Sequence, residues 1–173
     1  MSPGIGPVVA TAGGSRAFVE QLGADSIVDY RSETVVEDLR AALGGRKVYH
    51  VFDASNSVAS VKYLTAVLEK GGSYTATTGL VGAQKEILEE AGVWHEQIWV
   101  GSVHDEKPAG GILFGAVMSK IFEMALSEGK LSGHPYELIP NGLAGVGEAL
   151  VRLRDRKGGN AKFVYRISET PGL

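Results

Sequence analysis

The chain has 173 residues, of which 44% are hydrophobic and 21% charged, and its formal net charge is -3. This length suits one compact domain with a real core, and the slightly acidic balance gives no electrostatic reason to bind nucleic acid. The sequence contains no cysteine, its four histidines show no metal-ligand spacing, and no apolar run approaches the roughly 20 residues that cross a bilayer. We therefore expect a soluble, cytoplasmic protein without a metal or a membrane span.

In the first 105 residues, short apolar runs alternate with segments of helical periodicity. The runs predict strands over residues 7–13, 26–30, 47–55, 73–79 and 97–103. Helices are expected after Ser15, over 35–43, from 57 to 68, and over 84–91. Glycine pairs follow the second and third of these helices and indicate where they stop. This alternation is typical of a parallel sheet with connecting helices.

The last third of the chain has a different pattern. Apolar residues at helical spacing predict a long helix over 110–128, and a further helix is expected over 141–156. Two prolines in residues 134–140 favour an irregular or extended segment between them. The alternating terminal run predicts a half-buried or edge strand. We expect a single domain over 1–173, with residues 1–7 as an arm and 161–173 as a terminal strand and tail.

Three motifs follow one another in fixed order: LGADSIVDY at 22–30, VFD at 51–53 and LEKGG at 68–72. In this order and spacing the chain resembles the cofactor-domain half of the medium-chain dehydrogenase/reductase superfamily. The branch it resembles most is that of zinc-free quinone reductases and fungal trans-acting enoyl reductases. The resemblance runs from about Val8 to Ile167 and implies a Rossmann-like, doubly wound, mostly parallel sheet with helices on both faces.

The chain departs from this family at its first strand. No G-x-G-x-x-G turn stands between a strand and a helix, although this turn normally holds a dinucleotide pyrophosphate. Relatives also begin with a GroES-like domain that is not seen here. The resemblance implies that the family strand order 3-2-1-4-5-6 has lost strand 1. The remaining strands must then close up as 3-2-4-5-6 or borrow a strand.

Five residues are candidates for binding NADPH. Gly14, Ser15 and Arg16 follow the first strand, where the resemblance implies contact with the 2′-phosphate; the alternative is a helix cap with a solvated arginine. Tyr30 matches the family position beside the adenosine, or else packs at a strand end. Thr78 lies near the position that relatives give to the nicotinamide. Because the pyrophosphate turn is missing, we expect no cofactor, or NADPH if the protein acts as a reductase.

Four residues are candidates for catalysis. Asp53 and Thr77 each follow a strand, where a base or a hydroxyl donor would face a ligand; an aspartate there also commonly holds a turn. His104 and Asp105 form the only adjacent His-Asp pair, and the alternative for them is an exposed loop.

Three functions remain open. The first is cofactor-independent cyclisation or isomerisation of an apolar, polyketide-like intermediate, with a polyketide synthase as a possible partner. The second is NADPH-dependent reduction of an enoyl or quinone substrate, either by the protein or by a larger enzyme of which this is the cofactor domain. The third is a non-catalytic role as partner of a full reductase or synthase. The apolar strand expected over 97–103 favours a homodimer formed through that strand.

Overall fold

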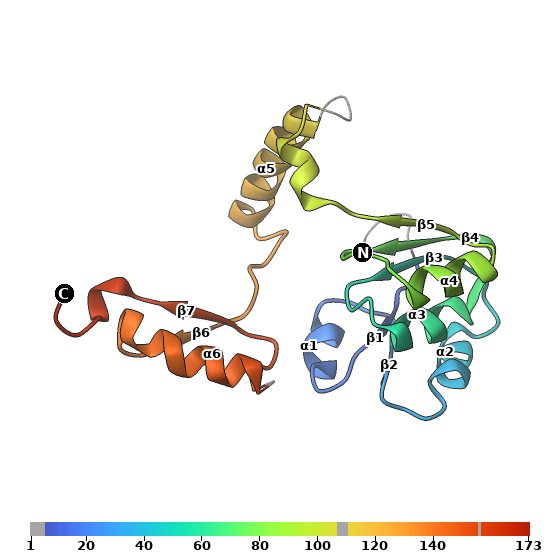
Figure 1. The fold of residues 1–173 in the computed structure, drawn as a ribbon, viewed down its shortest axis with the longest axis horizontal. Helices are drawn as coiled ribbons and strands as arrows, with labels where there is room; N and C mark the ends of the chain where they lie inside the picture. The colour runs from blue at the N-terminus through green and yellow to red at the C-terminus, as the bar shows by residue number, and fades with distance from the viewer. Residues whose placement is uncertain (1–5, 107–110, 156) are drawn as a thin grey trace. The chain divides into compact units, whose positions relative to one another are not determined.

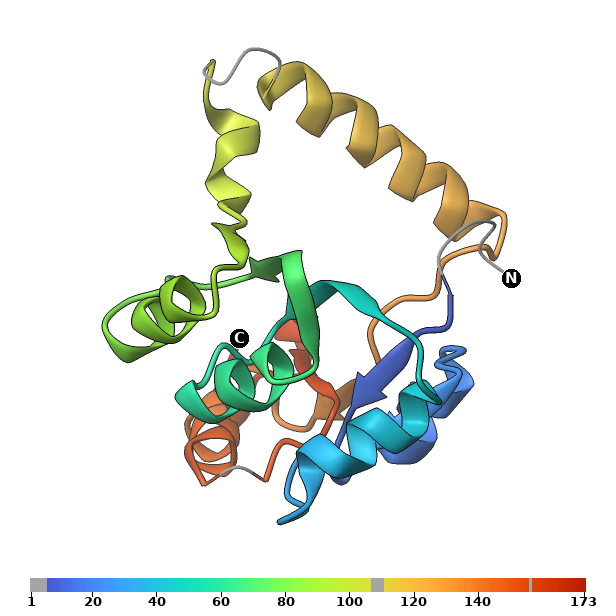
Figure 2. The ribbon, with the colours of Figure 1, turned by 90° about the vertical axis from the view of Figure 1, so that its right-hand side faces the viewer.

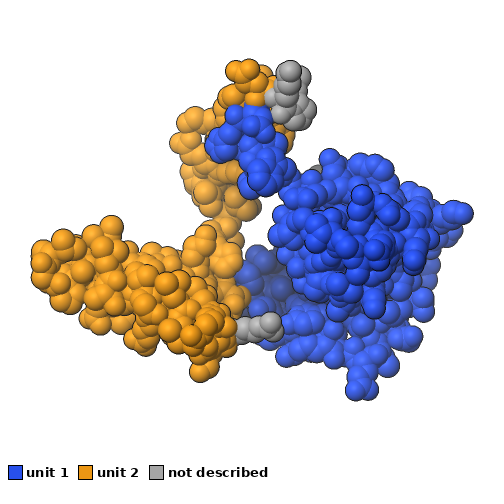
Figure 3. Space-filling model, in the orientation of Figure 1, with its two compact units in different colours: residues 1–105 blue, residues 106–173 orange. Residues whose placement is uncertain are grey.

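The computed structural model describes residues 6–106, 111–155 and 157–173. Its contacts divide the chain into two compact units, residues 1–105 and 106–173 (Figures 1 and 3). The expectation of a single domain stays a prediction. None of the helices within the described ranges is both long enough and apolar enough to span a membrane.

Unit 1 alternates strands and helices in the predicted order (Figure 1). Its strands are β1 (Val9–Thr11), β2 (Ser26–Val28), β3 (Val48–Asp53), β4 (Leu68–Ala76) and β5 (Trp94–Gln97). Its helices are α1 (Arg16–Gln21), α2 (Val35–Leu43), α3 (Val58–Thr65) and α4 (Ala83–Glu90), followed by a short 3-10 helix, η1 (Val100–His104). The fold class is therefore the predicted one: parallel strands with helices on both faces.

Local sequence explains several helix boundaries. Helix α2 ends at Gly44, whose left-handed φ of 58° is a conformation that glycine adopts without steric cost. Helix α3 begins after Ser57, whose side chain accepts a hydrogen bond from the backbone N–H of Ser60. Both signals were visible in the sequence.

The strands form two separate parallel sheets. Strand β1 pairs with β2 alone, whereas β3, β4 and β5 form a three-stranded sheet in that order. Of the two expected arrangements, closing up as 3-2-4-5-6 is wrong, because β1 and β3 do not pair, and borrowing a strand stays a prediction. In the described residues, both strands keep an unpaired edge at the place of the family's first strand. In Figure 2, β1 is the dark blue arrow.

The main core of unit 1 lies between the three-stranded sheet and helices α3 and α4. Its buried members are Val51, Val61, Tyr74, Ala76, Leu88 and Val93. Val51, Tyr74 and Ala76 lie on one face of β3 and β4, as the two-residue period of a strand requires.

Two predicted boundaries are wrong. Helix α3 stops at Thr65, and Gly71 and Gly72 lie inside β4 instead of ending the helix. Gly72 is buried, and a Cβ there would come within 2.8 Å of the Leu68 side chain, so this glycine serves close packing. The strand expected over 97–103 is also absent: β5 ends at Gln97, and Val100–His104 form the 3-10 helix.

Unit 2 contains α5 (Gly111–Ser127), β6 (Tyr136–Ile139), η2 (Gly142–Gly145), α6 (Val146–Arg154), β7 (Lys162–Tyr165) and η3 (Ile167–Glu169). Strands β6 and β7 pair in parallel. Arg152 of α6 joins them, since its guanidinium makes a two-point ion pair with Glu137 at 2.8 and 2.9 Å and lies 4.5 Å from the Phe163 ring centre.

Candidate functional site

The candidate site lies where the parallel strands of unit 1 end. In open α/β sheets, ligands bind at the carboxyl ends of the strands, because the loops there project from a rigid layer. Two groups of loops lie at the carboxyl ends of strands in unit 1: those after β1 and β2, and those after β3 and β4.

In the first group, Tyr30 packs against the loop that follows β1. A Cβ on Gly13 would lie 3.1 Å from Cε1 of Tyr30, so the ring sits directly on the backbone of this glycine. About half of the Tyr30 surface stays exposed. Ser15 occupies the N-cap position of α1, but its side chain makes no capping hydrogen bond. The loop therefore presents an aromatic face beside a hydroxyl that the helix does not use.

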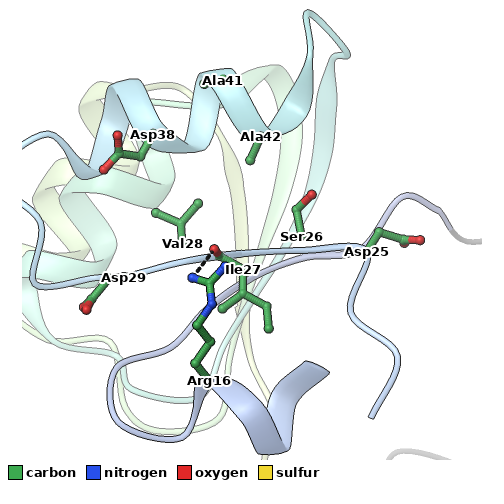
Figure 4. A pocket seen from close by; sticks show the side chains of 9 residues that line it. All are labelled: Arg16, Asp25, Ser26, Ile27, Val28, Asp29, Asp38, Ala41 and Ala42. Carbon is green, nitrogen blue, oxygen red and sulfur yellow. Dashed lines mark hydrogen bonds between the residues drawn. The ribbon is translucent and has the colours of Figure 1, made fainter. Parts of the chain in front are cut away.

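Arg16 turns toward the outer edge of β2. Its Nη1 donates a hydrogen bond of 2.9 Å to the carbonyl oxygen of Ile27 (Figure 4). An open depression of about 520 Å³ lies around this bond. Its charged lining consists of Arg16 and three aspartates: Asp25, Asp29 and Asp38. The depression itself is thus acidic and does not suit a phosphate.

Asp29 and Arg31 form an ion pair in the loop after β2. Arg31 Nη2 lies 2.6 Å from Asp29 Oδ2, and its Nε donates to Oδ1 at 2.9 Å. This side-chain hydrogen bonding from Arg31 lowers the pKa of Asp29 to about 2. Arg31 is therefore neutralised by its ion pair with Asp29. Arg16 bonds to a backbone carbonyl instead, so it is the cation of these loops that could more easily bind an anionic ligand.

In the second group, Asp53 is buried at the end of β3. Its Oδ2 accepts hydrogen bonds from Ser60 at 2.6 Å and Tyr74 at 2.5 Å, and its Oδ1 accepts from the backbone N–H of Ser55 at 2.8 Å. Burial raises the pKa of this carboxyl, but the hydrogen bonds from Ser60 and Tyr74 outweigh it and hold the pKa below its usual value. These contacts hold the turn after β3, and a role as base stays a prediction.

Thr77 and Thr78 extend the same network. The N–H of Thr77 donates to the Asp53 carbonyl at 3.2 Å, and its Oγ1 donates to the Ala54 carbonyl at 3.4 Å. Asn56 Nδ2 donates to the Thr78 carbonyl at 3.1 Å and to the Gly79 carbonyl at 2.9 Å. The structure therefore brings Asp53, Thr77 and Thr78 together.

Two residues of this region were not predicted from the sequence. Asn56 is buried with a left-handed φ of 50°, and its Oδ1 has no partner among the described residues. The asparagine before the Ser57 cap was the available signal. Tyr63 lies 3.4 Å from Thr11 Oγ1 through its hydroxyl and so connects α3 to β1. Burial raises the pKa of Tyr63, and no sequence pattern distinguished it.

His104 and Asp105 are exposed at the end of η1. Asp105 donates its backbone N–H to the Ser102 carbonyl at 3.2 Å. Within the described part of the chain, no hydrogen bond joins this pair to Asp53 or Thr77. Their arrangement is that of the exposed-loop alternative, and their catalytic role is untested.

Comparisons with known proteins place these observations in a family context. The sequence model described as zinc-binding dehydrogenase matches residues 3–104. A trans-enoyl reductase of Gibberella fujikuroi is 28% identical over 95% of this chain and 50% of its own length. The fold is similar to the CurF ER cyclopropanase from the curacin A biosynthetic pathway, with a TM-score of 0.68 and 18% identity over 91% of this chain and 46% of that one. It is also similar to CurA from Vibrio vulnificus in complex with NADPH, with a TM-score of 0.60 and 17% identity over 91% and 48%.

The chain spans about half the length of the curated relatives it matches. The name of the matching family implies zinc, which proteins bind through Cys, His, Asp and Glu side chains. The sequence has no cysteine, and across residues 6–106, 111–155 and 157–173 no three metal-ligating side chains gather closely enough to share an ion. These residues do not fit a zinc site.

Proposed function

Because the chain belongs to the zinc-binding dehydrogenase family, we propose that it is the nucleotide-binding part of an NADPH-dependent enoyl reductase. The main support for the proposal is the arrangement of side chains in the loop after β1. Gly14, Ser15 and Arg16 lie there beside the exposed ring of Tyr30, which packs on Gly13. Similarity to trans-enoyl reductases supports the reaction class.

The described residues fit one end of NADPH. The Ser15 hydroxyl does not cap α1, and Arg16 gives one of its five N–H groups to Ile27. Turning Arg16 away from that carbonyl would free a planar cation for the 2′-phosphate, while Tyr30 offers a face to the adenine. No glycine-rich turn for the pyrophosphate stands among residues 6–105. NADPH, when bound, supplies the hydride for reduction of an enoyl double bond; this chain supplies binding and orientation of the adenosine end.

Calorimetric titration with adenosine 2′,5′-bisphosphate tests the proposal, since this probe carries the 2′-phosphate without the nicotinamide. We expect it to bind about tenfold more tightly than 5′-AMP, which is a difference of about 1.4 kcal/mol. Arg16→Ala should abolish this preference and leave AMP binding unchanged, because it removes only the cation for the 2′-phosphate. Arg46→Ala, an exposed arginine of the α2–β3 connection, is the matched control. Equal affinity for the two nucleotides would overturn the proposal.

A second candidate is redox-free cyclisation or isomerisation of a polyketide-like intermediate. Likeness to the CurF ER cyclopropanase favours this candidate, because the name of that protein describes ring formation and its fold is similar to that of this chain. The two candidates separate in one assay with a linear polyene thioester. Because the first candidate gives this chain only the nucleotide-binding role, it expects no product with or without NADPH, whereas product of unchanged mass formed without NADPH supports cyclisation or isomerisation.

A further inference from the structure

A second open depression lies in unit 1, at the amino ends of β3 and β4. Its volume is about 470 Å³, which is close to that of the acidic depression around Arg16. The lining comes from the end of α2, the connection to β3, the residues after α3 and the start of β4, and its charged members are Arg40, Arg46, Glu69 and Lys70. The loops of the candidate site follow the carboxyl ends of strands, so this depression is a separate place in the unit.

The depression is basic, although the chain as a whole has a net charge of -3. Its one acid, Glu69, is paired with Lys47, whose Nζ lies 3.9 Å from Oε2 of Glu69. Among the described residues, Arg40, Arg46 and Lys70 form no ion pair. Three cations therefore line one space without a compensating charge. Such mutual repulsion costs stability, and an anion bound between the cations would relieve it.

Donors occupy several carbonyl groups at the ends of α2 and α3. Arg40 Nη2 donates to the carbonyl oxygen of Ala66, just after α3, at 3.2 Å. The backbone N–H groups of Gly44 and Arg46 bond to carbonyls in the last turn of α2. Because free carbonyls at a helix C-terminus disfavour anions, these bonds make the depression more suitable for one. The bond to Ala66 uses one of the five N–H groups of Arg40, which leaves the others for a ligand.

A bulge at the start of β4 carries Lys70. In the pairing of β3 with β4 the register shifts, and Tyr49 alone stands opposite residues 69–72. Gly71, within this bulge, has a left-handed φ of 80°, which glycine adopts without steric cost. A bulge changes the direction of side chains relative to a regular strand. The irregular start of β4 thus presents Lys70 to the same space as Arg46.

We propose that this depression is an anion site that binds a chain of linked phosphates, as found in a nucleoside triphosphate or in inorganic polyphosphate. Arginine meets phosphate oxygens two at a time, and lysine adds a compact point charge. Linked phosphates bring several negative charges into a small volume, which suits three cations around one depression. Adenosine 2′,5′-bisphosphate carries two separate monoesters and is not a ligand of this class. The site is independent of the nucleotide-binding role proposed for the loop of Arg16.

Titration of the whole chain with inorganic tripolyphosphate tests the proposal, with calorimetry for affinity and amide chemical shifts for location. At a salt concentration of about 50 mM, we expect a dissociation constant on the order of 0.1 mM. The shift changes should centre on Gly45, Arg46 and Lys70. A second titration with ATP distinguishes the two sources of the phosphate chain, because tighter binding of one probe identifies the preferred ligand.

Variants at exposed positions measure the contribution of each cation. Arg46→Gln and Lys70→Gln should each weaken tripolyphosphate binding about fivefold, and the double variant about twentyfold, because each change removes one exposed charge contact. The matched control is the double variant Lys62→Gln, Lys85→Gln, which removes the same charge from α3 and α4 outside the depression. It should change the affinity less than about twofold. Circular dichroism reports whether each variant is folded.

Four results would overturn the proposal. The first is no binding at about 10 mM tripolyphosphate. The second is a set of shift changes centred on Gly14 and Ser15 instead of on the depression. The third is an equal loss of affinity in the two double variants, which would mean general attraction to positive charge. In the fourth, a hexaglutamate peptide causes the same shifts at lower concentration, and an acidic protein segment is then the occupant.

Discussion

At the residue scale, Asp53 shows how burial and hydrogen bonding compete over one carboxylate. Burial raises the pKa of Asp53 in the folded protein, but the hydrogen bonds from Ser60 and Tyr74 outweigh burial, so this pKa lies below the usual value for an aspartate. A carboxyl with a lowered folded pKa stabilises the fold above its unfolded pKa of about 3.9, and this stability is lost as the pH falls through the folded pKa.

The first prediction concerns this acid dependence. Asp53→Asn cannot titrate, so its free energy of unfolding should fall less than that of the original protein between about pH 6 and pH 3. Urea unfolding at a series of pH values measures the two slopes. Parallel slopes would mean that Asp53 contributes nothing to acid sensitivity.

A second prediction concerns the partner hydroxyl. Tyr74 is fully buried and bonds to Asp53 at 2.5 Å. Tyr74→Phe removes a hydrogen bond to a charged group and should lower the free energy of unfolding by about 1.5–3 kcal/mol. Tyr49→Phe is the matched control at a half-exposed tyrosine, with an expected change near zero. Equal costs for the two variants would contradict the network described for Asp53.

At the scale of elements, the end of α2 depends on one backbone conformation. Gly44 has a φ of 58°, where an added Cβ is strained although no atom lies within 4 Å of it. Gly44→Ala should therefore lower the free energy of unfolding by about 1 kcal/mol. Gly14→Ala also adds its Cβ to open space but without a left-handed φ, and it should be nearly neutral in the same urea unfolding series. A neutral Gly44→Ala would show that α2 does not need this cap.

The element order of unit 1 could be predicted from sequence because periodicity and capping act locally. The glycine pair after α2 ends a helix as predicted, whereas Gly71 and Gly72 lie inside β4. Nothing local distinguishes the two pairs, because the second is decided by packing of Gly72 against Leu68. The strand expected over 97–103 failed for a related reason, since a run of apolar residues carries no information on whether a neighbouring strand is present.

The candidate site was predictable to a similar degree. The positions of Gly14, Ser15, Arg16 and Tyr30 follow from the end of each strand, which the apolar runs locate. The partner of each side chain does not, because Arg16 bonds to Ile27 at a sheet edge and Asp53 bonds to Tyr74 on the neighbouring strand. Those contacts depend on pairing between segments that are distant in sequence.

At the scale of the whole molecule, unit 1 is a doubly wound sheet interrupted at its centre. Among the described residues, the interruption lies between β1 and β3, which do not pair. Binding of the adenosine end requires only the loops after β1 and β2. Complete NADPH-dependent turnover requires the pyrophosphate site and a substrate site as well, so we expect residues 1–173 alone to bind the nucleotide without reducing an enoyl substrate.

The homodimer expected through residues 97–103 stays a prediction, although these residues do not form the expected strand beyond Gln97. Ile98, Trp99 and Val100 follow β5, and their exposed fractions are 45%, 64% and 80%. Three adjacent exposed apolar residues are typical of a contact surface. In light scattering after gel filtration, the whole chain should have the mass of a dimer. Val100→Glu should shift it to a monomer, because a dimer would bury that charge without a partner. Val81→Glu, at another well-exposed valine, should not, and a dimer that survives Val100→Glu would place the interface elsewhere.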